Sequence, residues 1–188
     1  MGDWIVDFGV YLLAYLLAGL CLKIGDDLLD EMEYPSLAWY PLGASGVLFG
    51  LLMAHSEWDL VLLTSIVSGV VLSGKVNRKE FSVGFVAIAL ILLFLGIPPI
   101  SDPLGWVTIL IMLFMASVFD EKGTDWIDAK RNPFIAWFFE HRFTLKITAF
   151  LLVIPWIGLL SVAIGLLLFD FGYELAGHLM RQTESRGR

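Results

Sequence analysis

Acidic residues gather at two places where a long apolar stretch ends, and clustered carboxylates can bind a divalent cation. The first group is the motif Asp26-Asp27-x-x-Asp30, and the second comprises Glu121 and Asp125. In each group two carboxylates are four residues apart, so on a helix they lie on one face. Mg²⁺ and Ca²⁺ prefer hard oxygen ligands of this kind. The spacing therefore favours a Mg²⁺ site to which both groups contribute.

Basic residues at the end of another apolar stretch could complete such a site. Lys75 and Arg78 follow the charge-free stretch over 60–74. Their cationic groups can contact phosphate oxygens, while the carboxylates hold the metal ion that a phosphate carries. Together the three groups predict binding of a metal-bound phosphate or pyrophosphate.

Helix capping is the alternative interpretation of both acidic groups. Acids at the C-terminus of a helix oppose its macrodipole, whereas at an N-terminus they cap free N–H groups. In that case the first helix ends at Gly25 and a short new helix begins at Asp26 or Asp27. Likewise, Gly123 closes one helix and Asp125 opens the next.

The Asp26-Asp27-x-x-Asp30 pattern resembles the aspartate-rich motif of isoprenoid-diphosphate enzymes, including membrane prenyltransferases of the UbiA type. In these families the motif binds Mg²⁺-pyrophosphate, and a second acidic motif lies on a later helix. The resemblance implies an isoprenoid or other lipid phosphate as ligand, with Glu121 and Asp125 as the second motif. It covers this local motif only, and Gly25 stands where the family has asparagine.

A second candidate site lies near the end of the chain. Asp170, Glu174 and His178 are spaced four apart and form a stripe on one side of a helix. We expect Asp7 at the same depth, on the outer side of the membrane. Ionisable residues at membrane depth are functional candidates, and this stripe could bind metal or relay protons. The alternative is a solvated helix face that begins where Asp170 meets water.

The composition excludes a soluble protein. Hydrophobic residues make up 58% of the 188 residues and charged residues 16%, against about 45–50% and about 25% in soluble domains. The net charge of −7 argues against nucleic acid as a partner. A single cysteine, Cys21, excludes an internal disulfide and a cysteine-based metal cluster. We therefore expect an all-α integral membrane protein in a lipid bilayer.

Charge-free stretches predict a bundle of six transmembrane helices in a single domain, residues 1–188. A spanning helix needs roughly 20 apolar residues. Pro155 and Gly158 predict a kink in the last span. The segment 134–142 is too short to cross and predicts an interfacial helix before that span. The predicted spans are residues 4–22, 36–54, 58–74, 82–98, 103–119 and 146–169.

Lysine and arginine residues define the predicted orientation. The N-terminus and the loops after spans two and four hold none of them, and three lie in the C-terminal tail. The positive-inside rule places the loops after spans one, three and five in the cytoplasm, so six spans put both termini outside. If 134–153 also crossed, the tail would be cytoplasmic, but a central charge such as Arg142 would cost about 2.5–3.5 kcal/mol. The loops after spans one, three and five hold Lys23, Lys75, Arg78, Lys79, Lys122, Lys130, Arg131, Arg142 and Lys146.

Short patterns predict local structure. Asp102-Pro103 and Ser56-x-x-Asp59 are typical of helix starts. The patterns Gly46-x-x-x-Gly50 and Ser65-x-x-x-Gly69-x-x-x-Ser73 are faces of small residues that allow close helix contact, within the chain or in a homo-oligomer.

Three functions agree with these patterns. The first is a small lipid-modifying enzyme with a cytoplasmic-face Mg²⁺/phosphate site. The second is a transporter or channel subunit that uses the outer carboxylate/histidine stripe, and the third is a non-catalytic membrane partner. The lack of disulfides favours a prokaryotic plasma membrane.

Overall fold

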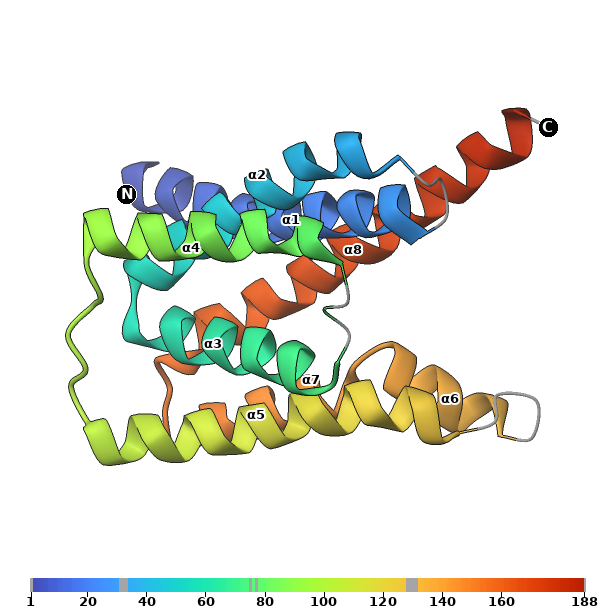
Figure 1. The fold of residues 1–188 in the computed structure, drawn as a ribbon. Helices are drawn as coiled ribbons and strands as arrows, with labels where there is room; N and C mark the ends of the chain where they lie inside the picture. Colours follow the sequence, from blue (N-terminus) through green and yellow to red (C-terminus); the bar gives the residue numbers. More distant parts are fainter. Residues whose placement is uncertain (1, 31–33, 75, 77, 128–131, 188) are drawn as a thin grey trace. The chain divides into compact units, whose positions relative to one another are not determined.

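The chain folds almost entirely into α-helices, as expected. A computed structural model describes residues 2–30, 34–74, 76, 78–127 and 132–187, and these residues form helices and no strands (Figure 1). A 3₁₀ turn, η1 (Lys79–Phe81), precedes the fourth helix. The helices are α1 (Gly2–Asp30), α2 (Pro35–His55), α3 (Glu57–Leu72), α4 (Ser82–Leu95), α5 (Pro103–Trp126), α6 (Pro133–Glu140), α7 (Phe143–Val153) and α8 (Leu159–Gly187).

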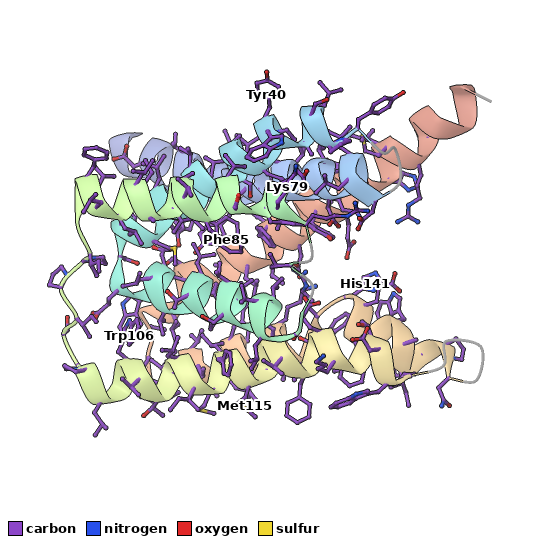
Figure 2. The ribbon with its side chains drawn as sticks, in the orientation of Figure 1. Tyr40, Lys79, Phe85, Trp106, Met115 and His141 are labelled. Carbon is purple, nitrogen blue, oxygen red and sulfur yellow. The ribbon has the colours of Figure 1, made fainter. Side chains whose placement is uncertain are left out.

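Four of the described helices are long and apolar enough to cross a membrane. Each apolar segment has 21 to 24 residues and is therefore about 32–36 Å long, which exceeds a hydrocarbon core of about 30 Å. Large apolar side chains on these helices point outward, among them Tyr40 and Met115 (Figure 2). These features indicate an integral membrane protein. The four segments are Asp7–Asp30, Pro35–His55, Pro103–Trp126 and Leu159–Gln182.

The last predicted span is two helices in the structure. α7 ends at Val153 and α8 begins at Leu159. Pro155 has no N–H to donate, and in a helix its ring would clash with the carbonyl group four residues earlier. The predicted kink is therefore a complete break. α3 and α4, with 16 and 14 residues, are also shorter than a typical span. The six-span count is therefore not confirmed.

The short helix predicted before the last span is α6. It begins at Pro133, directly after Asn132, as expected for proline at the first helical position. Phe134 and Trp137 are 72% and 44% exposed. The location of α6 in the membrane interface stays a prediction.

The helices form two compact units. Unit 1 comprises Met1–Ala54, Arg78–Ile97 and Ile164–Arg188, and unit 2 comprises His55–Asn77 and Pro98–Ala163. Unit 1 thus contains α1, α2, α4 and most of α8. Unit 2 contains α3, α5, α6, α7 and the first turn of α8.

In unit 1, α1 and α8 lie side by side and run in the same direction. Gly165 lies against the ring of Tyr15, and Gly177 lies against the side chain of Lys23. The residue numbers increase together along both helices, which makes the pair parallel. We call the end of unit 1 that carries Lys23 and Gly177 its polar end.

α2 runs opposite to α1. The hydroxyl of Ser45 donates to the backbone oxygen of Ala18 at 3.0 Å, whereas Leu42 lies beside Gly25. At the polar end Leu42 also packs with Leu29 in a buried apolar cluster.

α4 runs parallel to α2. Gly46 of α2 lies against the backbone of Gly84, and Gly50 lies against Ile91. The small-residue face predicted on α2 therefore provides a close helix contact inside the chain.

In unit 2, α5 lies between a parallel and an antiparallel neighbour. The indole N–H of Trp106 donates to the backbone oxygen of Glu57 at 3.0 Å, and Gly69 lies against Ser117, so α3 is parallel to α5 (Figure 2). α7 is antiparallel to α5, because its N-terminal end contacts the C-terminal part of α5 through Asp120. At the other end of this pair Trp156, which follows α7, lies beside Gly105.

The predicted start signals of α3 and α5 are confirmed. Ser56 Oγ accepts a hydrogen bond from the backbone N–H of Asp59 at 3.1 Å. The Asp102 carboxylate accepts one from the N–H of Gly105 at 3.1 Å, and Pro103 is the first residue of α5.

The predicted ends of the first and fifth helices at glycine are wrong. α1 continues through Gly25 and α5 continues through Gly123. A Cβ on Gly25 would collide with Leu42, and one on Gly123 would collide with the ring of Phe139. Both glycines therefore allow close packing and end no helix. Asp27 and Asp125, which follow these glycines, therefore lie in the C-terminal parts of α1 and α5 and not at a helix start.

Candidate functional site

Four polar side chains meet at the polar end of unit 1. Lys23, Asp26 and Asp27 belong to α1 and Tyr173 to α8, and we call them the α1–α8 polar cluster. Lys23 Nζ lies 2.6 Å from Asp27 Oδ1 and 3.7 Å from Asp26 Oδ2. The Tyr173 hydroxyl donates to Asp26 Oδ2 at 3.2 Å, and its ring centroid lies 5.2 Å from Lys23 Nζ. The cluster connects two helices that are far apart in the sequence.

Helical spacing and a glycine position the ammonium group of Lys23. Asp26 and Asp27 follow Lys23 by three and four residues, so both carboxylates lie on its side of α1. A Cβ on Gly177 would lie 3.0 Å from Lys23 Cε, so glycine leaves room for the lysine side chain between the helices. The positive charge also reduces the conflict between these acids and the C-terminal end of the helix dipole.

Asp27 is the most buried member of the cluster, with 2% of its surface exposed. One of its oxygens pairs with Lys23, and the other, Oδ2, is buried without a hydrogen-bond partner. A buried carboxylate oxygen without a donor costs free energy unless a cation or a donor reaches it. Asp27 Oδ2 is therefore an atom at which a ligand would be stabilised.

The predicted outer stripe lies on α8 and reaches the same polar end. Tyr173 lies between Asp170 and Glu174 in the chain and contacts Asp26 of α1. Gly177 contacts Lys23, so His178 is also at this end. The stripe and the aspartate-rich end of α1, which the sequence predicts on opposite sides, thus come together in unit 1.

The prediction that Asp7 and Asp170 share a depth is wrong. The backbone oxygen of Phe169 lies against Gly19, so Asp170 is beside the middle of α1. Asp7 precedes Gly19 by twelve residues, or about 18 Å of helix. Asp170 is buried, with 8% exposed, while Glu174 and His178 are exposed. The three residues of the stripe therefore do not share one environment.

The other predicted metal ligands are distributed over the two units. Asp30 is exposed at the end of α1, whereas Glu121 and Asp125 belong to α5 in unit 2. Among the described residues no group of three or more His, Cys, Asp or Glu side chains is arranged to hold a metal ion. The structure brings Asp26 and Asp27 together, and within the part of the chain that it describes no third ligand of these types joins them.

The predicted phosphate contacts are only partly covered. Lys75 lies outside the described residues. Arg78 is exposed and directly precedes η1 in unit 1. Lys79 and Glu80 are the first two residues of η1, and α4 follows it. Phe81 packs against the buried apolar cluster of the polar end, which places this basic segment near that end.

Asp120 is a key polar residue of unit 2 that was not among the candidate site residues predicted from the sequence. Its carboxylate is 1% exposed and accepts hydrogen bonds from the backbone N–H of Thr144 at 3.1 Å and of Leu145 at 2.7 Å. Asp120 thereby caps the N-terminus of α7 from a neighbouring helix, where the N-cap residue Arg142 has a left-handed backbone and no capping side chain. Its position directly before Glu121, at the end of an apolar stretch, was the feature of the sequence that could have indicated it.

Neighbouring charges in unit 2 also connect helices. Arg142 Nη2 lies 3.2 Å from Glu121 Oε1, which gives this predicted metal ligand a basic partner. The ammonium group of Lys122 donates to the backbone oxygen of Ser73 at 3.2 Å, at the C-terminal end of α3. Lys122 thereby brings a positive charge to the C-terminal end of α3, where the helix dipole favours it.

Comparisons with known proteins assign no family to the chain. No family model, no curated protein and no solved structure matches the chain. The described residues define a helical protein with four apolar helices of membrane-spanning length, a Lys23–Asp27 ion pair within α1 and a Tyr173–Asp26 hydrogen bond that joins α8 to α1.

Proposed function

We propose that this chain is a multi-pass protein of the prokaryotic plasma membrane that binds a metal-bound phosphate headgroup at the α1–α8 polar cluster. The observation that carries the proposal is the buried carboxylate of Asp27, whose Oδ2 has no hydrogen-bond partner. A Mg²⁺ ion beside Asp26 and Asp27 would satisfy this oxygen.

The number of carboxylates suits a metal that arrives with its phosphate. Mg²⁺ in proteins is usually bound by one or two carboxylates, with waters and substrate phosphate oxygens as the other ligands. The cluster offers two carboxylates, Asp26 and Asp27, and the ammonium of Lys23 beside them can contact a phosphate oxygen. Arg78, in the same unit, is a further candidate phosphate contact. Asp30, at the end of α1, remains a candidate metal ligand in this proposal.

A lipid phosphate is the ligand class that fits this location. The cluster lies near the C-terminal end of α1 and beside α8, and both helices are apolar enough to cross a membrane, so a lipid tail could lie in the bilayer while the headgroup meets the charges. The local resemblance of Asp26-Asp27-x-x-Asp30 to an isoprenoid-diphosphate motif favours an isoprenoid phosphate. A lipid-modifying activity would follow from this binding.

Thermal unfolding of the detergent-purified protein tests the proposal. Unfolding is measured without ligand, with millimolar Mg²⁺, and with Mg²⁺ plus pyrophosphate, for the native chain and for Asp27→Asn. The matched control is Asp7→Asn, which changes an exposed aspartate near the other end of α1. A ligand that binds only the folded state raises the free energy of unfolding by about 2.7 kcal/mol when its concentration is a hundred times Kd.

We expect Mg²⁺ with pyrophosphate to raise the unfolding temperature of the native chain and of Asp7→Asn, and to leave Asp27→Asn unchanged. Stabilisation of all three proteins to the same extent would show binding elsewhere. No stabilisation of any of the three proteins by Mg²⁺ with pyrophosphate would refute the proposal.

Transport is a second candidate function, favoured by Asp170. This residue is 8% exposed and lies within Leu159–Gln182, a helix segment of membrane-spanning length. Ionisable residues at membrane depth mark ion or proton pathways in many transporters. Altered ion flux in liposomes for Asp170→Asn, with Asp7→Asn as control, would support transport. If neither binding nor flux responds, a non-catalytic membrane partner is the function that remains.

A further inference from the structure

We infer that the chain crosses the membrane seven times and that its C-terminal tail lies on the cytoplasmic side, together with the aspartate-rich end of α1. The inference rests on helix directions inside each unit and does not depend on any ligand. Six crossings would put the tail on the opposite side from that end of α1.

The parallel pairing of α1 and α8 carries the argument in unit 1. Both contain a segment long and apolar enough to span a membrane. Gly165 contacts Tyr15 and Gly177 contacts Lys23, so the two helices ascend together. Two parallel spanning helices in contact have their C-terminal ends on one side of the bilayer. The end of α8 therefore shares a side with Asp26 and Asp27.

Parity then requires an odd number of crossings. Each crossing moves the chain to the other side, so an even number must separate the end of α1 from the end of α8. α2, α5 and α8 are three of these crossings by length and apolar character. Among α3, α4 and α7, either one or all three must also cross.

Unit 2 supports a crossing by both α3 and α7. α3 accompanies α5 from Trp106 to Lys122, through hydrogen bonds at each end. Residues 144–156, which comprise most of α7 and the turn after it, lie along α5 from Asp120 to Gly105, about 22 Å of rise in α5. Because α5 is itself a candidate span, neighbours that follow it over this length cross with it. α4 makes the third, since it runs parallel to the spanning helix α2 in unit 1.

The position of the charges removes the objection to a crossing near 134–153. Arg142 is the N-cap of α7, before its first helical residue, and Lys146 lies in its first turn. The ammonium of Lys146 points back and donates to the backbone oxygen of His141 at 2.7 Å. Both charges are thus at one end of α7, and residues 147–158 after them carry none.

Seven crossings also place every lysine and arginine on one side. In this topology the other side holds the N-terminus and the connections around residues 56, 96–102 and 154–158, which contain neither residue type. In the sequence, all 12 lysines and arginines fall in or near the segments that connect the opposite ends of the predicted crossings, or in the C-terminal tail. The positive-inside rule makes that side cytoplasmic. With seven crossings the arginines of the C-terminal tail obey the rule as well.

Cysteine accessibility in sealed membrane vesicles of both orientations tests the topology. Cys21→Ser supplies a background without cysteine, to which Ser101→Cys, Thr124→Cys or Gln182→Cys is added singly. These three positions are exposed. Both topologies place Thr124 inside and Ser101 outside, so these two variants calibrate a membrane-impermeant maleimide.

Gln182→Cys decides between the topologies. We expect the maleimide to label Gln182→Cys from the same side as Thr124→Cys. It should not label Gln182→Cys from the side that labels Ser101→Cys. Labelling from the Ser101 side would overturn the inference. A green fluorescent protein fused to the C-terminus of the unaltered chain gives a second measurement, since this reporter fluoresces in the cytoplasm. A fluorescent fusion supports seven crossings, and a well-expressed but dark fusion contradicts them.

Discussion

The hydroxyl of Tyr173 donates a hydrogen bond to the carboxylate of Asp26 across 147 positions of sequence, at 3.2 Å. This contact joins the C-terminal end of α1 to the middle of α8. It brings two acidic segments, which the sequence places on opposite sides of the membrane, to one end of unit 1. The candidate site is therefore a property of the α1–α8 pair.

Removal of the Lys23 charge is expected to destabilise the protein. In Lys23→Met the carboxylate of Asp27 stays buried and loses its cationic partner, a change that costs about 3–5 kcal/mol for buried ion pairs. Chemical unfolding in detergent, followed by tryptophan fluorescence, measures the difference in the free energy of unfolding.

The double variant Lys23→Met/Asp27→Leu is the control for this ion pair. Replacing both partners by apolar side chains removes the uncompensated charge, so most of the lost stability should return. A double variant that is less stable than Lys23→Met would show that the two residues act independently.

Asp120→Ala is expected to loosen the start of α7. The variant leaves the N–H groups of Thr144 and Leu145 without their acceptor, at about 1–3 kcal/mol for each buried donor. Faster hydrogen exchange at these two amides, together with a lower unfolding temperature, is the expected result. Asp7→Ala, at an exposed aspartate of unit 1, should change neither quantity. Equal effects of the two substitutions would argue against capping by Asp120.

Alanine at two helical glycines should have opposite effects. A Cβ on Gly46 would lie 2.6 Å from the Cα of Gly84, so α2 and α4 would have to separate, at about 1–3 kcal/mol for overpacking. Gly9 has no atom within 4 Å of the same added carbon. There alanine should be neutral or should gain up to about 1 kcal/mol of helix propensity. Thermal unfolding of the pair checks the α2–α4 contact, and a stable Gly46→Ala variant would contradict it.

Local patterns predicted the helix starts because they need only neighbouring residues. Ser56 and Asp102 accept hydrogen bonds from N–H groups three positions on, within one helical turn. Apolar stretches of about 20 residues likewise predicted the four long helices, since span length depends on bilayer thickness and residue type. The break near Pro155 was visible as a kink for the same local reason.

The residue type of two glycines predicted helix ends where the helices continue. Gly25 and Gly123 have the residue type that ends helices, yet each lies inside one because a neighbouring side chain occupies the space of its missing Cβ. Whether a glycine ends a helix or accommodates a neighbour depends on what packs against it. That partner, Leu42 or the ring of Phe139, is known only from the fold.

The sequence by itself determined that this chain belongs in a membrane, which segments are helical, and which residues are charged near their ends. Those properties follow from hydrophobicity and from hydrogen bonds within one turn. Only the tertiary structure decided that α8 runs parallel to α1, that Tyr173 meets Asp26, and that Asp120 caps α7. Helix direction and pairing depend on side-chain packing between segments that are distant in the sequence. The apolar composition of a helix does not determine whether it packs parallel or antiparallel to its neighbour.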